Sequence, residues 1–102
     1  MFLKFSIYKI EGDSMSPSFN KNTFVVIKSL KKKKINKFFI FQHETYGKLV
    51  KKLVKIDPSD HFWFEGEHQS SISKTQVGPI KEYNILGQIV FSISKSSIKF
   101  HL

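Results

Sequence analysis

The sequence predicts an all-β fold, an antiparallel sheet that is closed into a barrel or packed as a sandwich. Short segments rich in β-branched and aromatic residues recur along the chain, and clusters of turn residues separate them. No segment with helical periodicity reaches the length of a helix. At 102 residues with 40% hydrophobic content, the chain has room for one domain with one core. We expect that core over residues 1–93, with residues 94–102 as a C-terminal strand or a tail.

The first predicted strand covers residues 2–10, where Leu3, Phe5 and Ile7 alternate with more polar side chains. The other predicted strands cover residues 23–27, 37–42, 49–56, 61–65 and 85–93. The strand over residues 23–27 follows a turn that contains two asparagines, and the strand over residues 49–56 ends at a turn that contains Pro58.

The connections between these strands are polar. Residues 11–18 form a turn-rich stretch, and residues 66–79 form a polar loop. Residues 31–34 are four consecutive lysines, which we interpret as a solvated loop or an edge strand protected by charge. A site for stacked nucleic-acid bases is disfavoured there because no aromatic residues interleave with the lysines.

The net charge of +9 would suit a partner with phosphates or an anionic membrane surface. All 17 basic residues are lysines, however, and the chain has no alanine. Lysine has A/T-rich codons and alanine does not, so a biased genome accounts for much of the charge. We therefore expect no nucleic-acid partner, while a peripheral membrane contact through the lysines fits the composition.

Several classes of protein are excluded. The absence of cysteine excludes disulfide scaffolds and thiolate metal sites, and the four histidines show no ligand spacing. We therefore expect no metal and no cofactor. No apolar run approaches the ~20 residues that span a bilayer, and residues 1–10 make a poor secretion signal. These features predict a soluble, cytoplasmic chain without a transmembrane segment.

Ser14 is the candidate nucleophile. It lies in a turn after a predicted strand, where a hydroxyl can project from a rigid sheet edge. Gly12 permits close approach of the backbone, and neighbouring N–H groups can face a developing oxyanion. Pro17 sets the direction in which the chain leaves. An ordinary turn has the same composition, so this segment alone does not decide.

Lys51 and Lys52 interrupt an otherwise apolar strand. A lysine becomes a general base near neutral pH only if burial lowers its pKa by about 3 units, or roughly 4 kcal/mol. Desolvation of a single lysine can supply that amount. Strand alternation places the two lysines on opposite faces, and both could also extend to water. The physics of the strand therefore leaves both open as the base.

Together these residues resemble the signal peptidase I family. That family has a G-x-S-M-x-P nucleophile box, which residues 12–17 match in full, and a hydrophobic strand carrying Lys-Arg, which Lys51 and Lys52 match with lysine for arginine. The resemblance implies the catalytic-core fold of that family, with Ser14 as nucleophile, Lys51 as base, and the backbone N–H groups of Gly12 and Ser14 as the oxyanion hole. It spans about residues 8–91.

The third family box is altered. Alignment from Gly78 and Pro79 places Ser71 on the serine that orients the lysine, with Ser70 as the other candidate because the box is one residue short. Two further positions, where the family has an Asp–Arg ion pair, carry Ser73 and Thr75.

The resemblance implies a Ser/Lys endopeptidase that removes an N-terminal leader from a precursor. The short length and missing anchor are most similar to the subgroup that matures nickel-type superoxide dismutase, whose precursor would be the partner. Three alternatives use the same residues differently. The first is the self-cleaving domain of SOS-type repressors, which carries a DNA-binding segment and a cleavage site ahead of the nucleophile, for which we expect 13 residues before Ser14 to leave no room. The second is a general signal peptidase-like processing enzyme, and the third is a degenerate, non-catalytic binding module.

Overall fold

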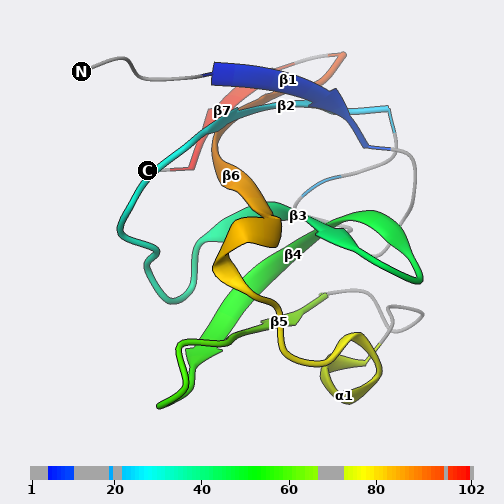
Figure 1. The fold of residues 1–102 in the computed structure, drawn as a ribbon. Helices are drawn as coiled ribbons and strands as arrows, with labels where there is room; N and C mark the ends of the chain where they lie inside the picture. Colours follow the sequence, from blue (N-terminus) through cyan, green and yellow to red (C-terminus); the bar gives the residue numbers. More distant parts are fainter. Residues whose placement is uncertain (1–4, 11–18, 20–21, 67–72, 96, 102) are drawn as a thin grey trace.

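Seven strands dominate the computed structural model, which describes residues 5–10, 19, 22–66, 73–95 and 97–101 (Figure 1). All six predicted strands are present, and the C-terminal residues add a seventh that the sequence left open. The strands are β1 (Phe5–Lys9), β2 (Phe24–Lys28), β3 (Phe38–His43), β4 (Gly47–Ile56), β5 (Phe62–Glu65), β6 (Ile85–Ile93) and β7 (Ile98–Phe100).

These strands form one antiparallel sheet in the order β1-β2-β6-β3-β4-β5, with β7 paired to β6. The all-β antiparallel prediction is thus confirmed. The sheet is open rather than closed, because β1 and β5 end the path and do not pair with each other in the described part of the chain. The register shifts where β6 pairs with β2, where β6 pairs with β3 and where β4 pairs with β5, and such bulges increase local twist. The sheet therefore curves without closing.

The curved sheet covers two hydrophobic clusters, and β3 contributes to both. Ile40 packs in the first cluster, whereas its neighbours Phe39 and Phe41 pack in the second. The alternation of side chains along a strand sends them to opposite faces. The other buried members of the first cluster are Ile10, Phe19, Val25, Ile27 and Ile89; those of the second are Leu53, Phe62, Phe64, Val77 and Ile80.

Gly87 lies where β6 passes between β2 and β3. Its cross-strand partner on β3 is Ile40, and a Cβ added at Gly87 would lie 2.9 Å from the backbone oxygen of Lys28. That separation is too short for any side chain. Glycine therefore allows β2 and β6 to approach closely at this point.

Two short helical segments lie between β5 and β6: α1 (Lys74–Val77) and the 3₁₀ turn η1 (Glu82–Asn84). The sequence predicted a loop over residues 66–79, so α1 corrects part of it. Ser73 caps α1, since its Oγ accepts from the Gln76 N–H while the Gln76 side chain accepts from the Ser73 N–H. This reciprocal capping box stabilises a single turn too short to show periodicity.

Among the described residues, no helix has both the length and the apolar character needed to cross a membrane.

Candidate active site

Lys51 is buried in the middle of β4. Its relative exposure is 1%, which makes it the most buried charged residue that the structure describes. Strand alternation places it on the same face as Leu49 and Leu53, which pack in the second hydrophobic cluster. On the neighbouring strand its direct partner is Phe39, which is also 1% exposed. The lysine thus shares its face with apolar side chains.

Burial lowers the pKa of Lys51 from its ordinary value of 10.5. The cause is desolvation, since an ammonium loses its hydration among apolar groups and the neutral amine does not. The neutral amine carries the lone pair that a general base needs. The burial of Lys51 therefore favours the neutral amine, which is the form that can act as a general base.

Lys52 occupies a different environment. It lies on the other face of β4, is only half-buried, and has Phe38 on β3 and Glu65 on β5 as its cross-strand partners. Sequence alternation could not choose between the two lysines. Burial distinguishes them, because Lys51 is enclosed and Lys52 has access to water.

Phenylalanine side chains pack tightly on the Lys51 face of the sheet. The Phe41 ring stacks on Phe64 with centroids 4.3 Å apart, and Phe39 meets Phe64 edge-on at 6.0 Å. Stacked and edge-on pairs of this kind fix the ring positions. All three rings are buried, so this face keeps Lys51 desolvated.

The predicted nucleophile Ser14 and the oxyanion residue Gly12 lie outside the described residues. The described residues on either side of them, Ile10 and Phe19, are both buried in the first hydrophobic cluster. The Ile10 N–H also donates to the Thr23 carbonyl at 2.8 Å. The chain therefore leaves β1 and returns to β2 at fixed points on one core.

β1 and β4 contact each other through side chains although they are not neighbours in the sheet. The Lys48 Nζ lies 4.9 Å from the centroid of the Tyr8 ring, and Tyr8 and Val50 pack on the same hydrophobic cluster. Tyr8 precedes Ser14 by six residues, and Lys48 precedes Lys51 by three. This contact lies on the face of β4 that carries Lys48, Val50 and Lys52, opposite the face of Lys51.

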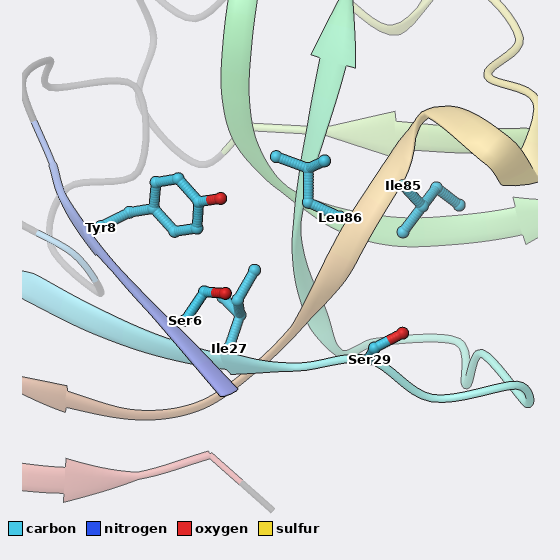
Figure 2. A pocket seen from close by; sticks show the side chains of 6 residues that line it. All are labelled: Ser6, Tyr8, Ile27, Ser29, Ile85 and Leu86. Atoms are coloured by element: carbon cyan, nitrogen blue, oxygen red, sulfur yellow. The ribbon is translucent and has the colours of Figure 1, made fainter. Parts of the chain in front are cut away.

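A cavity of about 210 Å³ lies beside β1. Figure 2 shows the Tyr8 ring and the Leu86 side chain extending toward the same space, with Ser6 and Ile27 at its side. The remaining lining residues are Ser29 and Ile85. β1 ends the sheet, and among the described strands it pairs only with β2, so no described strand pairs with its other edge.

The third predicted element is described only in part. Ser70 and Ser71 lie outside the described residues. The following residues Ser73 and Thr75, which replace the family ion pair, hydrogen-bond to each other through their hydroxyls at 3.2 Å. Beyond them, Ile80 exchanges two backbone hydrogen bonds of 2.8 Å with Phe62. A helix cap and a β-bridge therefore hold the segment without that ion pair.

Sequence reasoning missed His101. Its ring packs on Phe19 and Phe38 with centroids 4.7 and 6.1 Å away, and its Nε2 lies 2.9 Å from the Ser92 hydroxyl. Desolvation, with a smaller contribution from Lys99, lowers the pKa of His101. Nothing in the spacing of the histidines signals this contact, which depends on β7 returning to the core. His101 thus helps to fix Phe19, at the end of the Ser14 segment.

His43 links two parts of the fold. Its Nδ1 accepts from the backbone N–H groups of Thr45 and Tyr46, and its Nε2 lies 2.8 Å from the Val77 carbonyl. This arrangement requires a neutral ring with the proton on Nε2. Within the described part of the chain, no group of three acidic, histidine or cysteine residues is arranged to hold a metal ion.

Comparison with known families gives one match. The Peptidase S24-like family model matches residues 4–90, a range that includes the positions of Ser14 and Lys51. Comparisons with curated proteins and with solved structures gave no match. The prediction of a serine-peptidase-like family is confirmed at this level, while the signal peptidase I type and the superoxide dismutase subgroup stay predictions. The chain belongs to the Peptidase S24-like family.

Proposed function

We propose that this protein is a serine endopeptidase that removes an N-terminal leader from a precursor, with Ser14 as nucleophile and Lys51 as general base. The observation that carries the proposal is the burial of Lys51 on the β4 face that packs in the second hydrophobic cluster, where desolvation lowers the pKa of its amine. Lysines are seldom fully buried, and a buried lysine whose pKa is lowered by desolvation is a candidate functional residue. The family match supports the peptidase class.

The reaction follows from these two groups. The Lys51 amine takes the proton of the Ser14 hydroxyl as the oxygen attacks the scissile carbonyl. The resulting ammonium returns the proton to the leaving amine as the C–N bond breaks and the acyl-enzyme forms. Lys51, neutral again, then activates a water that releases the acyl group and regenerates Ser14. The backbone N–H groups of Gly12 and Ser14 would stabilise the oxyanion in both steps.

The free edge of β1 suits an extended peptide. A strand added there would hydrogen-bond to the β1 backbone, and every second side chain would face Ser6 and Tyr8 at the cavity. The modest cavity volume fits small or medium apolar side chains next to the cut. The peptide would also approach β4 at the Tyr8–Lys48 contact.

The specific substrate that we propose, from the sequence resemblance, is the precursor of nickel-type superoxide dismutase. Purified precursor is incubated with wild type, Ser14→Ala, Lys51→Ala and Lys52→Ala, and the new N-terminus is read by mass spectrometry. We expect cleavage by wild type and Lys52→Ala. Loss of the base in Lys51→Ala should lower the rate by about 10²–10⁴-fold, and Ser14→Ala should be inactive.

The outcomes test the Ser14–Lys51 assignment and the proposed substrate separately. Full activity in Ser14→Ala or Lys51→Ala would overturn the dyad. If wild type leaves the dismutase precursor intact but cleaves peptides from a leader-peptide library, the precursor is wrong and the peptidase assignment stands. If wild type cleaves none of them, the chain is a non-catalytic binding module.

A further inference from the structure

One outer face of the sheet is apolar and exposed. Six of the ten large hydrophobic residues that are exposed in the described part of the chain lie on β1, β2, β6 and β7. Figure 1 shows β1, β2 and β7 grouped around the second half of β6. We call this surface the apolar face, defined by Phe5, Ile7, Phe24, Ile93, Ile98 and Phe100.

Cross-strand register shows that these residues share one side of the sheet. Ile7 pairs with Val26, and Val26 pairs in turn with Phe91, which pairs with Phe100. Phe24 pairs with Ile93, which pairs with Ile98. Directly paired residues point to the same face, so the apolar residues form a continuous surface across four strands. Monomeric soluble proteins rarely leave such a surface uncovered unless it has a partner.

The charged residues on the four strands of this face are all lysines. Lys9 and Lys28 lie on it, and Lys28 Nζ is 5.9 Å from the centroid of the Phe5 ring. No strand among β1, β2, β6 and β7 carries an Asp or Glu. The acidic residues in the described part of the chain lie elsewhere: Glu44, Asp57, Asp60, Glu65 and Glu82.

We propose that the apolar face docks on an anionic lipid bilayer. Exposed phenylalanine and isoleucine side chains would enter the boundary between headgroups and acyl chains, while Lys9 and Lys28 meet lipid phosphates and carboxylates. A second copy of the chain fits less well, since two such faces would oppose lysines and the four described strands supply no carboxylate to pair with them. Docking in this way is independent of the peptidase chemistry.

The test is co-sedimentation of the full chain with vesicles. One set contains phosphatidylcholine with about 30 mol% phosphatidylserine, a typical anionic surface, and the other contains phosphatidylcholine alone. Wild type should bind the anionic vesicles and bind the neutral ones far less. The Ile98→Ser/Phe100→Ser double variant should bind at least about tenfold more weakly, because two apolar side chains no longer enter the lipid. Lys9→Gln/Lys28→Gln should weaken binding by about tenfold or more.

Matched controls separate this face from the rest of the surface. Tyr83→Ser removes a 77% exposed ring from η1, and Lys32→Gln/Lys34→Gln removes the same charge from the lysine run. Both should bind like wild type, and circular dichroism checks that every variant is folded. Four results would overturn the proposal: no binding by wild type, unchanged binding by the Ile98/Phe100 variant, equal losses in the controls, or a dimer that this variant dissociates and that does not bind vesicles.

Discussion

Phe39 on β3 is the direct cross-strand partner of Lys51 on β4, and each is 1% exposed. The pair places the one deeply buried lysine in the described part of the chain beside an aromatic ring. This relationship, more than any single motif, makes Lys51 unusual. It also determines how the protein should respond to pH.

The rate of peptide cleavage should rise with pH through the lowered pKa of Lys51, because only the neutral amine accepts the Ser14 proton. We expect an inflection below the ordinary lysine value of 10.5. Initial rates across a pH series measure it, with Lys52→Gln as the control that should leave the inflection in place. A rate that is flat with pH, or that rises only above 10.5, would contradict the role of Lys51.

The free energy of unfolding should also depend on Lys51. Between its lowered pKa in the folded state and 10.5 in the unfolded state, the unfolded chain binds the extra proton. Stability is therefore lost as pH falls from 10.5 through the folded pKa, and the penalty stays in full below it. Lys51→Met should raise the denaturation midpoint at pH 7 and flatten this dependence. Lys52→Met should do neither, and equal effects of both variants would refute the prediction.

Gly87→Ala should destabilise the fold by about 1–3 kcal/mol, as overpacking commonly does. The added Cβ would meet backbone atoms of Lys28, which cannot rotate away. Urea denaturation measures the change. Gly47→Asn is the control, since a side chain there meets open space and asparagine tolerates its φ of 75°. A loss at Gly47 as large as that at Gly87 would show that close packing is not the cause.

Mild acid should weaken the core through His101. Its pKa is lowered in the folded state, so the unfolded chain takes up the proton first as pH falls below about 6.5. The stability that neutral His101 contributes is present above that pH and is lost as pH falls through the folded pKa. His101→Phe keeps a ring against Phe19 and should reduce the loss between pH 7.5 and 5.5 by chemical denaturation.

The control for this prediction is His61→Gln, which removes a histidine that packs against neither Phe19 nor Phe38. It should retain the acid sensitivity of wild type. If His101→Phe loses as much stability in acid as wild type does, another group is responsible.

Local patterns predicted the strands well because each carries its own signal. The alternation through Phe5 and Ile7 and the β-branched run at Val25 need no distant information. β7 has no such signal, since Ile98, Lys99 and Phe100 are all exposed and its pairing depends on β6. The single turn of α1 is too short for periodicity, although Ser73 and Gln76 form a capping box that the sequence already displays.

In the candidate site, too, local patterns predicted some features, and others depend on long-range pairing. Alternation placed Lys51 and Lys52 on opposite faces, but both faces of β4 carry apolar residues, so the strand itself does not show which lysine is enclosed. Lys51 is enclosed partly by Phe39, its cross-strand partner, which lies 12 residues away in the chain. Whether the sheet closes likewise depends on pairing between strands that are far apart in the chain, which local patterns do not show. The roles of Ser14, Gly12 and Ser71 rest on the sequence and stay predictions.

β1 presents two surfaces through alternate residues, with Ser6 and Tyr8 at the cavity and Phe5 and Ile7 on the apolar face. Because side chains alternate with a period of two, deleting one residue at the end of this strand, while β2 keeps its place, would exchange the two sets. Phenylalanine and isoleucine would then fill the cavity, and the serine and tyrosine would face outward. The strand can therefore accept many substitutions but no change of length.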